Sequence, residues 1–256
     1  MGLLAPRKLA LIIEYDGTRY HGSQFQVGVP TVQGDVESAL EKLTGEEIRI
    51  ILAGRTDAGV HAKGQVISFN TYSTLSGHTI VKALNSYLRP DIAVKYASEE
   101  DSSFNARRDA VSREYRYEIL NSPTPSPLKQ RYAYHVLAAL DTDAMNRACG
   151  CLVGSHDFAS FTGPMKGITV REVYKAEVSR EGETVFFNMV ANAFLPGQVR
   201  CTAGCLLRVG LGKMTAGEFE DVMQAKEAGL AAPVAPPHGL CLMKVNYPDG
   251  RLEKGS

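Results

Sequence analysis

The 256-residue sequence contains no tryptophan, no excess of either charge and no long apolar run. Lys and Arg together number 28, as do Asp and Glu, so any polyanionic partner must be bound by a local patch rather than by the field of the whole molecule. No apolar stretch approaches the roughly 20 residues of a membrane-spanning helix. The run 9–13 is also too short for the core of a signal peptide, because Glu14 ends it. We therefore expect a soluble cytoplasmic protein without a membrane partner.

Cysteine is also scarce, with five residues in the chain. An odd number, in a chain large enough to build a core without cross-links, favours reduced thiols and predicts no disulfides. The C-x-C spacing of Cys149 and Cys151 and the C-x3-C spacing of Cys201 and Cys205 are atypical of zinc sites, so we expect no metal. Small buried apolar side chains are the simpler interpretation of these residues.

The apolar pattern of the first hundred residues predicts alternating strands and helices. Thr31 is expected to cap the first helix and Gly45 to end it. The expected elements are a strand at 8–15, a helix at 31–45, strands at 47–53 and 65–70, a helix at 78–88 and a strand at 91–98. The order β-α-β-β-α-β is typical of the ferredoxin-like (RRM-like) pattern.

The rest of the chain predicts a second set of strands and helices, without a detectable sequence repeat. The expected elements are a strand at 112–120, a helix at 141–153, strands at 171–179 and 184–192, helices at 196–211 and 215–227, and a strand at 240–247. We therefore predict an α+β fold of two α/β halves, 1–104 and 105–256. Their antiparallel sheets are expected side by side with the helices packed behind, and the active-site cleft is expected between the halves.

The segment GRTDAGVHAKGQ, residues 54–65, combines a single carboxylate, Asp57, with Arg55, His61 and three glycines. Glycines suit a tight turn that lets another molecule approach the main chain, so the loop is expected to present Asp57. A lone histidine in such a loop is more often a structural hydrogen-bonding group than a catalytic one. A phosphate-binding hydrolase is disfavoured, because no G-x-x-x-x-G-K-[ST] pattern occurs and Asp57 would repel an anion.

The segment RRDAVSREYRY, residues 107–117, mixes arginines with Tyr115 and Tyr117. Arginine binds phosphates and aromatic rings stack on unpaired bases, so this segment is expected to contact RNA, with Arg107 as a substrate-binding candidate. A solvated edge strand with outward charges is the alternative. A second stretch, 191–217, lacks acidic residues and includes Arg200.

Six segments together resemble the tRNA pseudouridine synthase A family, in the expected order over nearly the whole chain. They are residues 14–24, 53–66, 104–117, 157–161, 191–200 and 239–248. The sequence GRTDAGVHA is the most specific of these matches. The resemblance implies isomerisation of uridine to pseudouridine at positions 38, 39 and 40 of the tRNA anticodon arm, by a homodimer that needs no cofactor and no metal.

The resemblance also implies roles for individual residues. By position, Asp57 matches the catalytic aspartate and Arg55 the neighbouring arginine that holds the extruded nucleotide. Tyr115 matches the tyrosine that stacks on the target base. Arg200 matches the basic residue that pairs with the aspartate, and Leu240 the apolar residue that lines the base pocket.

The chain departs from the family pattern at two places. Ser23 stands where the family usually has tryptophan, and Pro196 and Gly197 stand where it usually has a basic or histidine pair. These departures are expected to affect RNA contacts or the start of the helix that carries Arg200. They prompt an alternative interpretation, a non-catalytic RNA-binding protein or RNA-folding helper on the same scaffold, against which the retained Asp57 argues.

A single carboxylate is chemically sufficient for this isomerisation. Glycosidases typically need two carboxylates, because one protonates the leaving group while the other attacks or activates water. Here the uracil is retained, and an anionic uracil is a tolerable leaving group. The sequence leaves open whether Asp57 attacks C1′, adds to the base or removes the C2′ proton.

Overall fold

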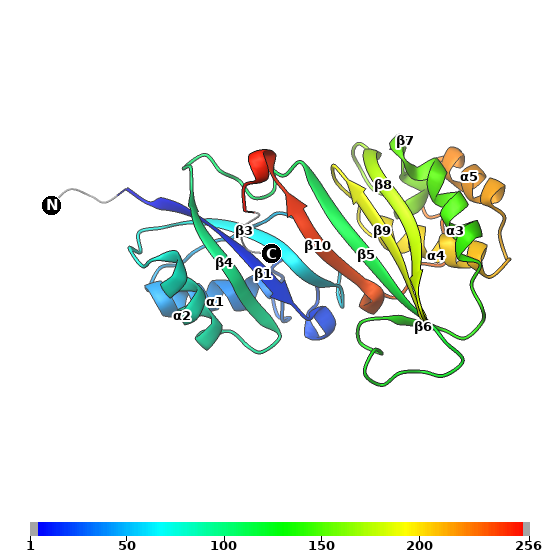
Figure 1. Cartoon of the computed structure of the whole chain (residues 1–256). Helices are drawn as coiled ribbons and strands as arrows, with labels where there is room; N and C mark the ends of the chain where they lie inside the picture. The colour runs from blue at the N-terminus through cyan, green and yellow to red at the C-terminus, as the bar shows by residue number, and fades with distance from the viewer. Residues whose placement is uncertain (1–4, 253–256) are drawn as a thin grey trace. The chain divides into compact units, whose positions relative to one another are not determined.

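The computed structural model describes residues 5–252, and the chain divides into two compact units (Figure 1). Unit 1 comprises Met1–Val111 and Leu242–Ser256, and unit 2 comprises Ser112–Cys241. The division into functional domains 1–104 and 105–256 stays a prediction. Among the described residues, no helix is both long enough and apolar enough to cross a bilayer.

Unit 1 has the β-α-β-β-α-β order that the sequence predicts. Its elements are β1 (Arg7–Tyr15), α1 (Val32–Thr44), β2 (Ile51–Leu52), β3 (His61–Thr71), α2 (Gly77–Tyr87), β4 (Ile92–Glu100) and the last strand, β10 (Leu240–Asn246), which runs in unit 1 from Leu242 onwards. The strands are arranged β4-β1-β3-β10, with β2 paired to β3. β1 pairs with both β3 and β4 in antiparallel register.

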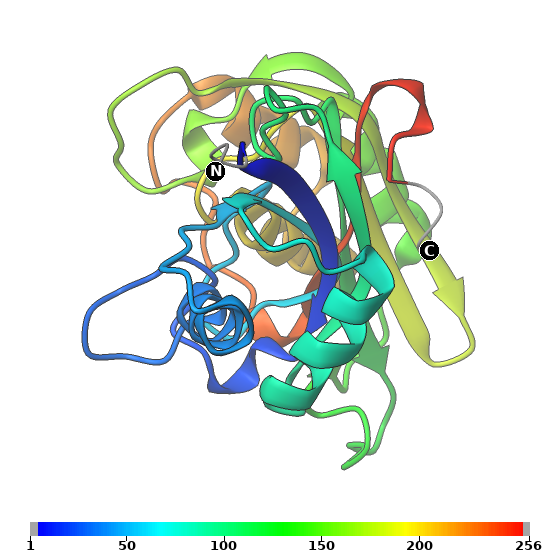
Figure 2. The same cartoon turned by 90° about the vertical axis from the view of Figure 1, so that its left-hand side faces the viewer.

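The core of unit 1 is built from a strand buried along nearly its whole length and a helix buried along one face. β1 has neighbours on both edges, and Leu9 and Ile13 on it are buried, while α1 buries Val36 and Leu40. The helix begins and ends as predicted. Thr31 accepts the Gly34 N–H at 3.2 Å, and the residue after the helix, Gly45, is left-handed with φ 73°. In Figure 2, α1 is seen end-on, with α2 beside it.

The strand predicted over 47–53 is much shorter in the structure, since only Ile51–Leu52 form β2. Ile48 and Ile50 are buried as a strand pattern predicts. The side chain of Glu37 on α1, however, accepts the Ile50 N–H at 3.0 Å. This bond takes a backbone donor that a neighbouring strand would otherwise bind.

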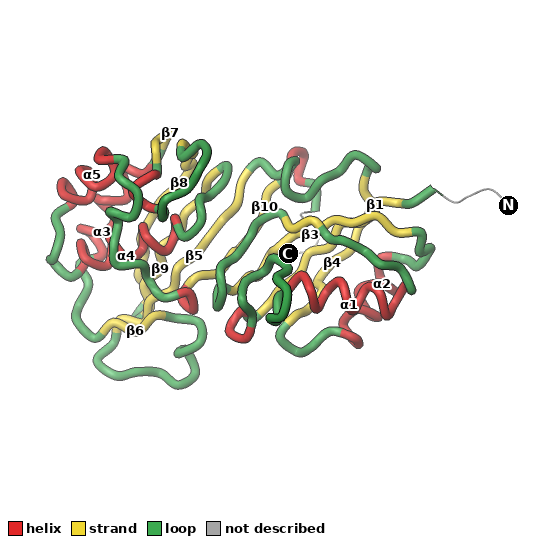
Figure 3. Tube along the Cα trace, turned by 180° about the vertical axis from the view of Figure 1, so that it is seen from behind, coloured by secondary structure: helices red, strands yellow, loops and turns green. Residues whose placement is uncertain are grey.

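Unit 2 contains the strands and helices predicted between residues 112 and 227 and two short strands that were not predicted, whereas the strand predicted at 240–247 is β10, most of which belongs to unit 1. Its elements are β5 (Ser112–Asn121), β6 (Tyr134–Val136), α3 (Thr142–Cys149), β7 (Gly154–Asp157), β8 (Val170–Glu181), β9 (Thr184–Ala191), α4 (Gln198–Gly210) and α5 (Ala216–Ala225). The order β5-β9-β8-β7 is antiparallel, and β6 pairs with β5 in parallel. Helix α3 packs against β8, α4 and α5. The three helices α3, α4 and α5 lie together in Figure 3.

The core of unit 2 is aromatic. The rings of Phe158, Phe161 and Phe219 form a chain with centroid separations of 6.0 and 5.7 Å, and all three are fully buried. Tyr117 and Phe187 face each other across β5 and β9 and are also fully buried. This core fixes the positions of β5 and α4, which carry candidate site residues.

Candidate active site

The loop between β2 and β3 is anchored by buried polar side chains from elsewhere in unit 1. The Gln65 side chain accepts the Gly54 N–H at 3.2 Å and donates to the Gly54 carbonyl at 2.7 Å. Ser23 binds Thr56 in the same two-point manner, because its Oγ accepts the Thr56 N–H at 2.9 Å and its own N–H donates to the Thr56 carbonyl at 3.0 Å. The hydroxyls of Tyr15 and Thr56 are 2.8 Å apart. The main chain at Gly54 and Thr56 is therefore fixed in place.

This anchored main chain carries Arg55 and Asp57. Arg55 is exposed, whereas Asp57 is half-buried. The turn closes after Asp57, because its carbonyl accepts the Val60 N–H at 3.1 Å and Gly59 adopts a left-handed φ of 77°. The loop thus presents a carboxylate, Asp57, and a cation, Arg55, on a main chain whose geometry is fixed by these hydrogen bonds.

His61 has a structural position at the end of the same loop. Its ring is buried, and Nδ1 accepts the Gly17 N–H at 3.0 Å. Asp16 Oδ1 lies 3.2 Å from the same nitrogen. Gly17 lies so close to the loop that a Cβ there would be 2.0 Å from the Val60 carbonyl oxygen. His61 and Gly17 therefore join the turn after β1 to the loop of Asp57.

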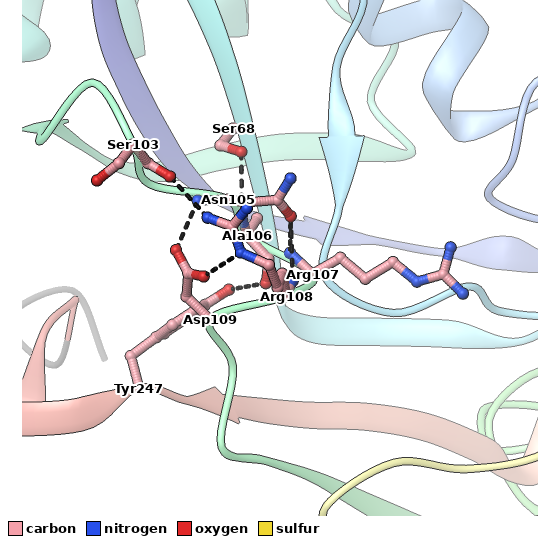
Figure 4. Close-up of polar contacts among 8 residues, drawn as sticks. All are labelled: Ser68, Ser103, Asn105, Ala106, Arg107, Arg108, Asp109 and Tyr247. Carbon is pink, nitrogen blue, oxygen red and sulfur yellow. Dashed lines mark hydrogen bonds and ion pairs between the residues drawn. The ribbon is translucent and has the colours of Figure 1, made fainter.

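A second turn, residues 105–109, carries Arg107 (Figure 4). The Asn105 side-chain oxygen accepts the N–H groups of Arg107 and Arg108, each at 3.0 Å. Asp109 in turn accepts the Asn105 N–H at 2.8 Å and binds the Arg108 guanidinium at 2.9 Å. The Asn105 N–H, and after it Arg108, hold the pKa of Asp109 below its usual value. The turn is thus closed by its own side chains.

The same turn is fastened to the rest of unit 1 through the N–H and carbonyl groups of Ala106. Ser68 on β3 accepts the Ala106 N–H at 3.1 Å, and the Tyr247 hydroxyl donates to the Ala106 carbonyl at 2.6 Å. The guanidinium of Arg107, which is exposed, extends away from these contacts in Figure 4. An exposed arginine on a fixed turn is suited to binding a phosphate group.

Tyr115 and Arg200 lie in unit 2. Tyr115 is on β5 and largely buried, and its ring meets the edge of Phe194 at a centroid distance of 5.1 Å and an angle of 84°. Arg200 is in the first turn of α4, and its Nε donates to the Ala235 carbonyl at 2.9 Å. The Ala235 N–H returns a bond to the Arg200 carbonyl at 3.1 Å. This pair of bonds ties the start of α4 to the segment that leads to β10.

That segment also contacts β5 and ends at Leu240. The Tyr117 hydroxyl donates to the Pro236 carbonyl at 2.8 Å, and Gly239 packs so tightly on Tyr117 that an added Cβ would lie 2.7 Å from the ring. Leu240 is buried directly after this contact. Within unit 2, Tyr115, Arg200 and Leu240 are thus carried by three connected segments. The pairing of Arg200 with Asp57 stays a prediction.

The five cysteines, all within the described residues, form no disulfide, and Cys149, Cys201 and Cys205 are buried. Loss of solvation raises the pKa of Cys149 to about 12 and that of Cys205 to about 11. Within residues 5–252, no three His, Cys, Asp or Glu side chains gather in a manner suited to holding a metal ion.

Comparison with known proteins supplies the family. The protein-family model described as tRNA pseudouridine synthase matches residues 11–108 and 148–248. The chain belongs to this family. The matched segments contain Arg55, Asp57, Arg107, Arg200 and Leu240, whereas residue 115 lies between them.

Three relatives match almost the full chain, and each is a tRNA pseudouridine synthase A. The Chloroflexus aurantiacus protein is 44% identical over 252 residues, covering 96% of this chain and 91% of the relative. The Roseiflexus castenholzii protein is 47% identical over 248 residues, covering 95% and 92%. The Exiguobacterium protein is 42% identical over 243 residues, covering 94% and 98%.

Among solved structures, the chain resembles one from the crystal structure of an archaeal box H/ACA sRNP Nop10–Cbf5 complex. The sequence identity is 14% and the TM-score is 0.34, with 78% of this chain and 43% of that chain covered. A likeness this distant supports no conclusion about function.

Proposed function

We propose that this protein converts uridine to pseudouridine in tRNA, at positions 38, 39 and 40 of the anticodon arm. The observation that carries the proposal is that Asp57 lies within a segment matched to the family, on a loop whose main chain is anchored at Gly54 and Thr56. The relatives named above, which match at least 94% of this chain, support the choice of tRNA as substrate. A homodimer and a cytoplasmic location are part of the same proposal.

The reaction is an isomerisation and balances without any other reagent. The N1–C1′ bond breaks, the uracil turns, a C5–C1′ bond forms, the C5 proton leaves and N1 gains a proton. Asp57 is the catalytic residue of this scheme, because a carboxylate can act both as a nucleophile and as a base. No step consumes an oxidant or a reductant, and we expect no dependence on a metal ion or an organic cofactor.

The remaining site residues bind the substrate in this proposal. Arg55 holds the nucleotide that leaves the stack, and Arg107 binds a backbone phosphate from its fixed turn. Tyr115 and Leu240 provide the apolar surfaces for the base. Arg200 supplies a positive charge to balance Asp57, because an ionised carboxylate in a partly dry pocket is costly without a counter-ion.

The test is to incubate the protein with an unmodified tRNA transcript and to map pseudouridine along it. We expect product at positions 38–40 of transcripts that carry uridine there, with and without EDTA. Asp57→Asn is the matched variant, because Asn is nearly isosteric and is tolerated in a turn. It should fold, bind tRNA at least as tightly as the unaltered protein and form no detectable pseudouridine, since an amide neither attacks nor accepts a proton at useful rates.

Two results would contradict the proposal in different ways. Substantial turnover by Asp57→Asn would show that this loop is not the catalytic centre. Binding of tRNA without product from any transcript would favour a non-catalytic RNA-binding protein on the same scaffold.

A further inference from the structure

Three consecutive peptide groups around Arg55 are each bound by a residue from outside the loop. The carbonyl of the peptide between Gly54 and Arg55 accepts a hydrogen bond from the Gln65 side-chain amide at 2.7 Å. The next peptide, between Arg55 and Thr56, gives its N–H to Ser23 Oγ at 2.9 Å. The third, between Thr56 and Asp57, accepts the Ser23 N–H at 3.0 Å. Gln65 and Ser23 therefore fix the peptide planes before and after Arg55. Ser23 also fixes the peptide plane that precedes Asp57.

Both of these residues are completely buried, since Ser23 and Gln65 are each 0% exposed. Hydrogen bonds that are shielded from water are stronger, and a buried backbone group that loses its partner cannot replace it with solvent. The Tyr15 hydroxyl extends the set, because it lies 2.8 Å from the Thr56 hydroxyl and 3.4 Å from the Gln65 amide nitrogen. The anchoring residues thus form one connected buried network.

We propose that Ser23 is a positioning residue for Asp57, which, with Gln65 and Tyr15, fixes the main chain that presents Arg55 and the catalytic carboxylate. This role rests on the proposed function. Ser23 does not touch the substrate. It acts through Thr56, and it sets where the carboxylate is held relative to the C1′ and C5 atoms of the bound nucleotide.

The identity of residue 23 matters for this role. The resemblance to the family leads us to expect tryptophan here, but the indole N–H is a donor only and cannot accept the Thr56 N–H. The serine Oγ accepts that bond, in addition to the main-chain bond from the N–H of residue 23 to the Thr56 carbonyl. In this chain, the departure from the family pattern therefore supplies one of the bonds that anchor the loop.

A merely structural serine is available as a control within the same protein. Ser160 in unit 2 is also 0% exposed, and its Oγ accepts the Glu227 N–H at 3.0 Å. Ser160→Ala and Ser23→Ala remove the same buried hydroxyl, but the N–H that loses its partner belongs to an exposed residue, Glu227, in the first case and to the buried Thr56 in the second. Both variants should lose thermal stability, Ser23→Ala more than Ser160→Ala, and only Ser23→Ala should alter the chemistry.

The experiment measures the single-turnover rate of pseudouridine formation under saturating enzyme, together with the Kd for the unmodified tRNA. We expect Ser23→Ala to slow the single-turnover step by about 10- to 100-fold, because small misplacements of a reacting group cost that much, while its Kd changes less than about twofold. Ser160→Ala should keep the single-turnover rate of the unaltered protein. A folding defect alone would not separate rate from Kd in this way.

Each of the other possible results either supports or overturns the positioning role of Ser23. A folded Ser23→Ala that reacts at the unaltered rate, while Asp57→Asn is inactive, would overturn the positioning role and leave the proposed function intact. An unaltered protein that makes no pseudouridine would overturn both. Should Ser23→Ala not fold, Tyr15→Phe takes its place, because it keeps the ring and removes only the hydroxyl next to Thr56. A slower single turnover at unchanged Kd supports the role, and an unaltered rate overturns it.

Discussion

At the scale of single residues, burial controls the reactivity of the thiols. Cys149 and Cys205 are buried, and the loss of solvation raises their pKa values to about 12 and about 11. At pH 8 the thiolate fraction is then about one in a thousand or less, and the thiolate is the form that reacts. We expect iodoacetamide to label both residues at least about 100-fold more slowly than free cysteine. Peptide mass spectrometry of the labelled protein would measure these rates.

The control for this prediction is the same labelling in concentrated urea, where unfolding should restore ordinary cysteine reactivity. If labelling of Cys149 and Cys205 in the folded protein were as fast as in urea, the thiols would not be buried as described.

The residues that form the proposed site differ in how far the sequence reveals them. Asp57 and Arg55 belong to a short contiguous motif, so they can be named from the sequence alone. Ser23 and Gln65 act on positions 33 and 11 residues away, and neither polarity nor spacing marks such a pairing. From the sequence, Ser23 was only a departure from the family pattern. Its contact with Thr56 becomes visible once the two segments are placed in space.

At the scale of elements, the sequence predicts most of the helices and strands because their periods are clear and their ends are capped. The strands that it misses are short, with three residues in β6 and four in β7, too few to show an alternating pattern. The helix expected from Pro196 begins instead at Gln198. Gly197 has a left-handed φ of 71°, which is incompatible with the first turn of a right-handed helix.

This left-handed glycine leads to a prediction about α4. Gly197→Ala should cost about 1 kcal/mol in folding free energy, because an L side chain is disfavoured at this φ. If the start of α4 positions Arg200, the variant should also lower the rate of pseudouridine formation. Thermal unfolding and the tRNA mapping assay measure the two effects separately.

Gly212, after the end of α4, is the matched control for that variant. It has a similar φ of 67°, and an added Cβ would meet nothing within 4 Å. Gly212→Ala should therefore lose similar stability and keep the unaltered turnover. Equal turnover in both glycine variants would indicate that the geometry at residue 197 does not influence Arg200.

At the scale of the whole molecule, the balance of 28 basic and 28 acidic residues gives no net attraction for tRNA. Binding must then depend on local phosphate contacts, whose strength falls with salt because counter-ions are released. We expect the logarithm of the affinity to fall steeply and linearly with the logarithm of salt concentration. Arg107→Ala should reduce that slope by about 1, which filter binding at several salt concentrations would measure.

Lys175→Ala is the control for the loss of one positive charge. Lys175 lies on β8 and is paired with Glu177 at 2.7 Å, outside the two basic segments. Its removal should leave the salt slope unchanged. A flat salt response of the unaltered protein would count against phosphate contacts as the main source of affinity.

The close approaches of glycine to main chain in unit 1 change how an alignment of this family should be interpreted. A Cβ at Gly17 would lie 2.0 Å from the Val60 carbonyl oxygen, and one at Gly64 would lie 2.5 Å from the Met243 carbonyl oxygen. Each glycine is thus required by packing within this chain, whether or not RNA is bound. If glycine is conserved at these two positions of an alignment, that conservation would reflect the packing of the fold. A protein that had lost all activity would keep the same glycines for as long as it had to fold.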